Sequence, residues 1–170
     1  FFIYLFIAVF IDGLMTGRTP EVFGRKIEVT EIKLLAVVIV LQPVMLLTLT
    51  AITLAMPNLT GNSNPSFHAI SQVFYEYVSA FANNGSGFEG LADNTVWWNL
   101  STSIALLAGR YSILIIPVLI AVSLASKVQG SENKGSLQIE SLTFALTLVG
   151  IVLILTLLQF MPVLVLGPIA

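Results

Sequence analysis

The run Asn83-Asn84-Gly85-Ser86 has the composition of a loop whose backbone could bind a cation. For successive carbonyl groups to face one axis, neighbouring residues must alternate between ordinary and left-handed dihedral angles. Glycine adopts the left-handed conformation without steric cost, and asparagine tolerates it better than most residues. Carbonyl oxygens held in this way can replace the hydration shell of a cation. The sequence therefore predicts a cation-binding loop here, with an ordinary exterior Asn-Gly turn as the competing interpretation.

Arg110 is the second residue that could act on an ion, because it is the one charged residue in the apolar stretch 97–126. If a helix begins near Trp97, Arg110 lies about 20 Å along its axis. An ionised side chain at that depth is costly and is by default a functional candidate. Two interpretations stay open: Arg110 gates ion exit beneath the loop, or its side chain snorkels to the interface from the end of a short helix.

The composition identifies the class of protein that holds these residues. Of 170 residues, 56% are hydrophobic and only 9% are charged, whereas a soluble domain has about 25% charged residues. We therefore expect an all-α integral membrane protein, embedded in the lipid bilayer and without a nucleic-acid partner. With no cysteine and one histidine, disulfides, cysteine nucleophiles and multi-histidine metal clusters are excluded.

Hydropathy and charge divide the chain into successive segments. A membrane span needs roughly 20 residues, so the apolar run 1–11 is expected to be the end of a helix whose start is missing, in a C-terminal fragment. The expected segments are the truncated transmembrane helix 1–11, a cytoplasmic loop 12–33, a transmembrane helix 34–57, an external loop 58–65, a pore helix 66–82, a selectivity-filter loop 83–90, a broken transmembrane helix 97–126, a cytoplasmic loop 127–138 and a final transmembrane helix 139–161.

The distribution of basic residues gives the orientation. Four of the seven lie in 12–33, and none lies in 58–98, so the first segment is expected in the cytoplasm and the second outside. The helix at 66–82 would be about 25 Å long, too short to cross the membrane. A half-length helix with both ends on one side favours a re-entrant pore loop over an exterior turn. Counting crossings places the C-terminus outside.

The stretch 97–126 would be about 45 Å long as one helix, which exceeds the hydrocarbon thickness of about 30 Å. We therefore expect a break at Gly109-Arg110 or at Pro117.

Several stretches, in order along nearly the whole chain, resemble a known family. They are Gly17-Arg18-Thr19-Pro20-Glu21 with Gly24-Arg25-Lys26-Ile27-Glu28, then Ser79-Ala80-Phe81-Ala82-Asn83-Asn84-Gly85-Ser86 with Phe88 and Gly90-Leu91, then Leu106-Leu107 with Gly109-Arg110 and Ile116-Pro117-Val118-Leu119, and Leu166-Gly167-Pro168. The sequence is similar to the potassium-binding A subunits of Kdp-type potassium-transporting ATPases.

The resemblance implies the helix, re-entrant pore loop, helix repeat of the potassium-transporter superfamily. The fragment would hold the end of the third repeat, the complete fourth repeat and an extra C-terminal transmembrane helix. Asn83, Asn84, Gly85 and Ser86 would form the fourth filter strand, with K⁺ held by the backbone carbonyls of Asn84 and Gly85. Arg110 would be the conduction-path arginine, and the family usually has small residues at the positions of Gly87 and Glu89.

The function that follows from the resemblance is selection and translocation of K⁺ for an ATP-driven uptake complex in a bacterial or archaeal plasma membrane, the cell inner membrane, with the C-terminus on the periplasmic side. K⁺ is the transported ion. ATP would be hydrolysed by a P-type partner subunit, assisted by accessory subunits, because the chain has no Walker A or Asp-Lys-Thr-Gly motif and no catalytic site is expected in it. The alternatives are a Trk- or Ktr-like channel subunit without an ATPase, an intramembrane enzyme, and a membrane scaffold.

Overall fold

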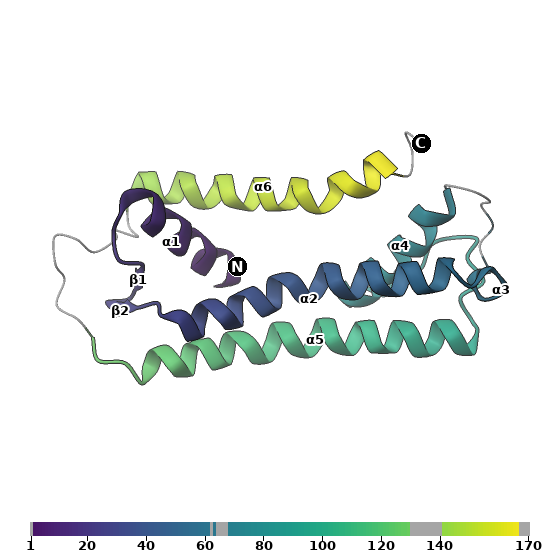
Figure 1. The fold of residues 1–170 in the computed structure, drawn as a ribbon, viewed down its shortest axis with the longest axis horizontal. Coiled ribbons are helices and arrows are strands. Elements are labelled where there is room, and N and C mark those ends of the chain that lie inside the picture. The colour runs from purple at the N-terminus through teal and green to yellow at the C-terminus, as the bar shows by residue number, and fades with distance from the viewer. Residues whose placement is uncertain (1, 62, 64–67, 130–140, 167–170) are drawn as a thin grey trace. The chain divides into compact units, whose positions relative to one another are not determined.

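A computed structural model describes residues 2–61, 63, 68–129 and 141–166, with side chains described as far as residue 158. The chain is mostly helical, as expected (Figure 1). Its elements are α1 (Phe2–Thr16), β1 (Glu21–Val22), β2 (Arg25–Lys26), α2 (Val29–Leu54), α3 (Pro57–Thr60), α4 (His68–Ala82), α5 (Val96–Ala125) and α6 (Leu142–Leu166).

Within the described residues, α2 and α5 are long and apolar enough to cross a membrane. They overlap the spans expected at 34–57 and 97–126, but α2 begins at Val29, inside the expected loop, and ends at Leu54. Large apolar side chains on both helices are exposed, for example Leu47 at 60% and Leu114 at 59%. Apolar faces of this extent are what lipid or a neighbouring membrane segment would cover.

The expected boundary at residue 11 is wrong, because α1 continues to Thr16. Asp12 and Gly13 are buried in the helix, and the Thr16 hydroxyl donates a hydrogen bond to the Asp12 carbonyl at 2.7 Å. The helix ends where Gly17 adopts a φ of 65° and the Arg18 N–H donates to the Gly13 carbonyl at 3.0 Å. The expected boundary was placed where the sequence becomes polar, at Asp12. The helix itself ends five residues later, just before the left-handed residue Gly17.

The expected loop 12–33 also contains a β-hairpin. Glu21 pairs with Lys26, and Val22 pairs with Arg25. Phe23 and Gly24 both have positive φ, which is the geometry of a two-residue turn that matches the twist of the strands.

The expected break in 97–126 is wrong as well, because α5 is a single helix of 30 residues that contains Pro117. A proline removes one helical hydrogen bond, and the turns on either side of it can maintain the helix. Gly109 serves a contact with another helix, described below, rather than a break.

Contacts divide the chain into two compact units, each with a hydrophobic core. The first unit comprises Phe1–Val37 and Ile115–Gln159, and the second comprises Val38–Leu114 with 160–170. Phe6, Val22 and Ile120 are among the most buried residues of the first unit. In the second unit, which contains the predicted site, Val73, Tyr77 and Trp98 are among the most buried core residues. Gly167-Pro168 and most of the expected loop 127–138 lie outside the described residues.

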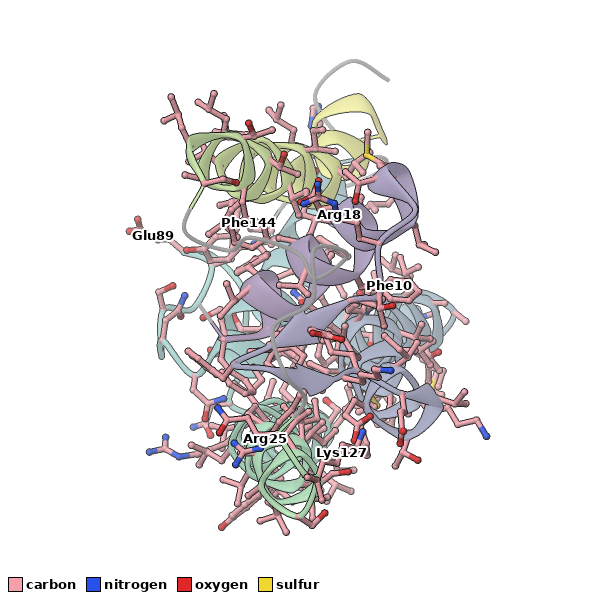
Figure 2. All side chains as sticks on the ribbon, turned by 90° about the vertical axis from the view of Figure 1, so that its left-hand side faces the viewer. Phe10, Arg18, Arg25, Glu89, Lys127 and Phe144 are labelled. Atoms are coloured by element: carbon pink, nitrogen blue, oxygen red, sulfur yellow. The ribbon has the colours of Figure 1, made fainter. Side chains whose placement is uncertain are left out.

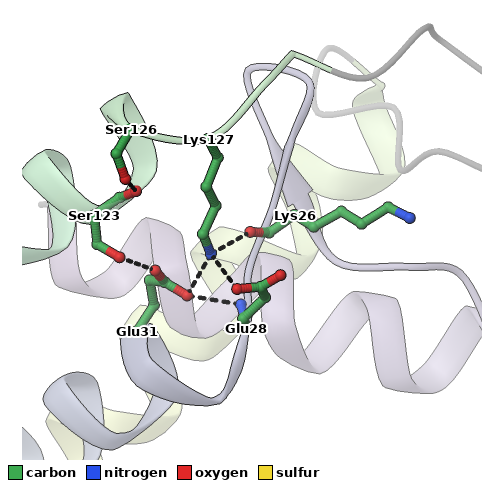
Figure 3. Close-up of polar contacts among 6 residues, drawn as sticks. All are labelled: Lys26, Glu28, Glu31, Ser123, Ser126 and Lys127. Carbon is green, nitrogen blue, oxygen red and sulfur yellow. Dashed lines mark hydrogen bonds and ion pairs between the residues drawn. The ribbon is translucent and has the colours of Figure 1, made fainter.

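A polar cluster in the first unit joins the beginning of α2 to the end of α5 (Figure 3). The Lys127 ammonium lies 2.9 Å from a carboxylate oxygen of Glu31 and 3.1 Å from one of Glu28. The Glu31 side chain is fully buried and also accepts a hydrogen bond from the Ser123 hydroxyl. Arg25, labelled beside Lys127 in Figure 2, donates to the Lys127 carbonyl at 3.3 Å, so the hairpin is held to the same end of α5.

Burial tends to lower the pKa of Lys127, but the hydrogen bonds to Glu31 and Glu28 outweigh it and raise that pKa above its ordinary value. The ammonium form is therefore favoured in the folded protein.

Candidate ion-binding loop

The predicted site begins at the end of α4. This helix has 15 residues and is about 22 Å long, which is shorter than a bilayer core of about 30 Å. It ends at Ala82, and the next residue, Asn83, has a φ of 58°. The Asn83 N–H donates to the Ala80 carbonyl at 3.1 Å, and the Asn84 N–H donates to the Ser79 carbonyl at 3.3 Å. This is a Schellman cap, in which a left-handed residue lets the chain turn back on the last helical turn.

The backbone of the loop then alternates in conformation. Asn83 has a φ of 58° and Gly85 a φ of 74°, with Asn84 between them outside the positive-φ region. This is the alternation that the asparagine and glycine content of the loop predicted. Successive peptide planes turn in opposite senses along such a chain, and their carbonyl groups can then face one side.

The carbonyl oxygens of Asn83, Asn84 and Gly85 accept no hydrogen bond from the residues that the structure describes. Asn84 and Gly85 are also exposed. The carbonyl of Ser86 differs, because it accepts a hydrogen bond from the Ser79 hydroxyl of α4. Of the four predicted residues, the first three thus offer unengaged backbone oxygens, and the fourth has its carbonyl directed at the helix.

Three side chains of α4, which the sequence did not single out as site residues, contact the second half of the loop at Ser86 and Phe88. The Tyr75 hydroxyl lies 2.9 Å from the Ser86 hydroxyl, and its ring packs edge-on against Phe88 at 5.5 Å. A Glu76 carboxylate oxygen accepts the Phe88 N–H at 3.1 Å, and Ser79 contacts Ser86. The available signal was that Ser79 follows Glu76 by three residues and Tyr75 by four, because this spacing makes Ser79 a neighbour of each of them on the helix surface.

The structure brings Arg110 to the base of the loop. Its Nη1 lies 3.5 Å from the side-chain oxygen of Asn83. The Asn83 amide group donates to the Phe81 carbonyl at 2.9 Å and to the Leu106 carbonyl at 3.4 Å. Asn83 therefore connects the end of α4 to α5 and to Arg110. Within the described residues, Arg110 makes no hydrogen bond to Asn84, Gly85 or Ser86.

Gly109 permits this approach of α5 to α4. A Cβ atom built at Gly109 would overlap the Phe81 carbonyl oxygen. The glycine that the sequence identified as a possible break is thus a point of close contact between the two helices, and it is followed directly by Arg110.

A buried hydroxyl network fixes α4 from behind. The Tyr77 hydroxyl lies 2.6 Å from the Thr53 hydroxyl and donates to Ser101 at 2.9 Å. The indole of Trp97 donates to Thr53 at 3.0 Å. Tyr77 and Thr53 are completely buried, so these hydrogen bonds set the position of α4 against α2 and α5 within the second unit.

The acidic residue Glu89 lies outside this set of contacts. Its side chain is exposed and is labelled in Figure 2. Its carbonyl oxygen accepts a hydrogen bond from Gln72 at 3.5 Å. In the described ranges, no group of three or more His, Cys, Asp or Glu side chains is placed to hold a metal ion.

Comparison with known proteins gives a consistent assignment over the whole chain. A family model described as KdpA, potassium-transporting ATPase A subunit, matches residues 1–170. A potassium-transporting ATPase potassium-binding subunit from Nostoc sp. is 56% identical over 170 residues, covering 99% of this chain and 30% of the relative. Subunits of the same name from Gloeobacter violaceus and Geobacillus kaustophilus are 52% and 50% identical, covering 99% and 98% of this chain and 29% and 30% of their own lengths.

The chain thus spans about 30% of the length of the curated relatives that it matches. Its match to the family model extends from the first residue to the last. The chain therefore belongs to the family of potassium-transporting ATPase A subunits.

Proposed function

We propose that the chain is part of a K⁺-selective, ion-binding and translocating subunit of an ATP-driven K⁺ uptake complex. In this proposal the loop 83–90 supplies one strand of a four-strand selectivity filter, and K⁺ is bound by the backbone carbonyls of Asn84 and Gly85. Asn83 and Ser86 complete the strand. The relatives are named as potassium-binding subunits of a potassium-transporting ATPase, which supports K⁺ as the ion.

The observation that carries the proposal is the conformation of the loop. A half-length helix ends in residues with φ of 58° and 74° on either side of Asn84, and three successive carbonyl oxygens have no donor in the described part of the chain. Oxygens that lack a hydrogen-bond donor can be satisfied by a cation that loses its water. The C-terminus of α4 adds a partial negative charge at the same place. An exterior turn would not require a half-length helix ahead of it.

In the proposed complex, ATP is hydrolysed by a P-type partner subunit, with accessory subunits also bound, and this chain contributes the ion pathway in a bacterial or archaeal plasma membrane. The expected orientation has the loop 83–90 and the C-terminus outside. A Trk- or Ktr-like channel subunit is less well supported, because the relatives are named as parts of an ATPase. Arg110, beside Asn83, is proposed to act on ions that leave the filter.

The proposal is tested by replacing Gly85 with alanine in the whole subunit, assembled in its complex. A Cβ at Gly85 meets no atom within 4 Å, so the change acts through the left-handed backbone alone. That conformation costs an L-residue about 1–2 kcal/mol. Gly17→Ala is a matched control, because Gly17 has a φ of 65° and equally free space but lies in the first unit.

The measurement is K⁺-stimulated ATP hydrolysis as a function of K⁺ concentration. We expect Gly85→Ala to reduce the apparent K⁺ affinity and Gly17→Ala to leave it unchanged. Gly85→Asn should lie closer to the wild type, because asparagine tolerates positive φ. Equal K⁺ dependence in all four proteins would overturn the filter assignment.

A further inference from the structure

Ser79 is a buried side chain of α4 that reaches the loop at two points. It is 3% exposed, and its hydroxyl lies 2.5 Å from the side-chain oxygen of Asn84. It also donates to the Ser86 carbonyl and lies 3.3 Å from the Ser86 hydroxyl. A hydroxyl has one proton, so Ser79 donates to one of these acceptors at a time.

The bond to the Ser86 carbonyl determines where the row of unengaged oxygens ends. A carbonyl that accepts from α4 points toward that helix, whereas those of Asn83, Asn84 and Gly85 have no such donor among the described residues. The Asn84 side chain reinforces the turn, because its oxygen also accepts the Ser86 N–H at 3.0 Å. Ser79 thus holds the peptide group at which the loop changes direction.

Glu76 holds the loop one turn of α4 earlier. It is 9% exposed, and its carboxylate accepts the Phe88 N–H at 3.1 Å. A Cβ at Gly87 would lie 3.4 Å from that carboxylate and 3.3 Å from the carboxylate of Asp93. The segment from Ser86 to Phe88 is therefore hydrogen-bonded to α4 at both ends. Its central residue, Gly87, lies close to the carboxylates of Glu76 and Asp93.

We propose that Ser79 and Glu76 are positioning residues that set the ion selectivity of the loop, by fixing Ser86 and Phe88 against α4 and leaving the carbonyls of Asn84 and Gly85 for the ion. This inference rests on the proposed function. The distance between opposed carbonyl oxygens determines which dehydrated cation is coordinated well. Releasing the strand from α4 lets its carbonyls adapt to cations of other sizes.

The first test is Ser79→Ala in the whole subunit, assembled in its complex, with K⁺, Rb⁺ and Na⁺ as probes of ion-stimulated ATP hydrolysis. Alanine removes one oxygen atom and fits the same space. We expect the apparent K⁺ affinity to fall about tenfold, the scale of one lost hydrogen bond to a buried group. The preference for K⁺ over Rb⁺ and Na⁺ should narrow, while turnover at saturating K⁺ changes little.

Ser112→Ala is the control, because within the described residues the Ser112 hydroxyl donates to carbonyls of its own helix, that of Ala108 at 2.6 Å and that of Gly109 at 3.5 Å. It should retain the wild-type ion preference. A merely structural role for Ser79 would lower the amount of complex or its thermal stability and leave the ratio of K⁺ to Rb⁺ affinity unchanged.

Glu76 provides a second, independent variant pair. Glu76→Gln retains an oxygen that accepts the Phe88 N–H, and Glu76→Ala does not. We expect Glu76→Gln to preserve the preference for K⁺ over Rb⁺ and Na⁺, and Glu76→Ala to reduce that preference. Unchanged ion preference in Ser79→Ala and Glu76→Ala, in a complex whose K⁺ affinity responds to Gly85→Ala, would overturn this inference alone. Failure of Gly85→Ala to alter K⁺ affinity would overturn the proposed function itself.

Discussion

Gly109 of α5 packs directly against the Phe81 carbonyl at the end of α4, with no space for a side chain between them. Gly109→Ala must therefore separate the two helices or displace the loop that follows α4. Forcing an extra methyl group into a packed contact costs about 1–3 kcal/mol. We expect a lower thermal unfolding midpoint of the purified complex and a lower apparent K⁺ affinity.

Gly150→Ala is the matched control for this prediction. Gly150 lies inside α6, and a Cβ there meets no atom within 4 Å. Alanine also favours a helix by about 1 kcal/mol relative to glycine. If Gly109→Ala behaved like Gly150→Ala in both measurements, the close contact with Phe81 would not exist in the folded subunit.

Arg110 places a positive charge next to Asn83, with Nη1 3.5 Å from its side-chain oxygen. If this charge acts on ions leaving the filter, Arg110→Gln should change the K⁺ transport rate at saturating K⁺, and Arg110→Lys should retain more of the wild-type rate. The measurement is K⁺ uptake into vesicles that contain the whole complex. Lys33→Gln, an exposed basic residue of the first unit, is the control.

The snorkelling interpretation of Arg110 gives a different result. A side chain that only extends to the interface has no effect on ions in the pathway, so glutamine would change stability or assembly without changing the rate per assembled complex. A normal rate for Arg110→Gln would therefore contradict the conduction role.

Lys127 compensates the fully buried carboxylate of Glu31 at 2.9 Å. Lys127→Met should destabilise the first unit by about 1–3 kcal/mol, because it leaves a buried charged group with an unsatisfied hydrogen bond. Glu28→Gln is the control, since Glu28 is 65% exposed and an exposed ion pair contributes about 0–1 kcal/mol. Thermal unfolding of the purified complex distinguishes the two variants.

The raised pKa of Lys127 fixes the sign of its pH dependence. A base whose pKa is higher in the folded state stabilises that state at every pH below its ordinary pKa and loses the effect as the pH rises through the folded value. The difference in unfolding midpoint between wild type and Lys127→Met should therefore persist at neutral and mildly alkaline pH and shrink in strong alkali. A difference that disappears near neutrality would contradict the assigned interaction.

The helical class, the two long apolar helices and the shorter helix before the loop were predictable from sequence. Each depends on hydropathy or on local conformational preference. The positive φ of Asn83 and Gly85 followed in the same way, from the tolerance of these residue types for left-handed backbone. The break expected in α5 was wrong because a glycine in a helix can serve a close packing contact, and sequence alone does not reveal the partner of Gly109.

The contacts that Ser79 and Glu76 make with the loop were beyond sequence reasoning for a similar reason, although their spacing of three residues places both side chains on one face of the helix. Ser79 and Glu76 are ordinary helix residues whose importance depends on contacts with Ser86 and Phe88, seven and twelve positions away. The ion pair of Glu31 with Lys127 joins residues 96 positions apart, and no local pattern relates them. Such contacts are fixed by tertiary packing. The pattern of apolar residues shows which face of a helix is buried, but it does not show which residues that face contacts.

The most direct test is to locate the ion itself in the whole subunit by anomalous scattering from crystals grown with Rb⁺ or Tl⁺ in place of K⁺. We predict an anomalous peak coordinated by the carbonyl oxygens of Asn84 and Gly85, and loss of that peak in Gly85→Ala but not in Gly17→Ala. Ordered ions elsewhere in the subunit, with water or a protein donor at both carbonyls, would contradict the proposed binding site.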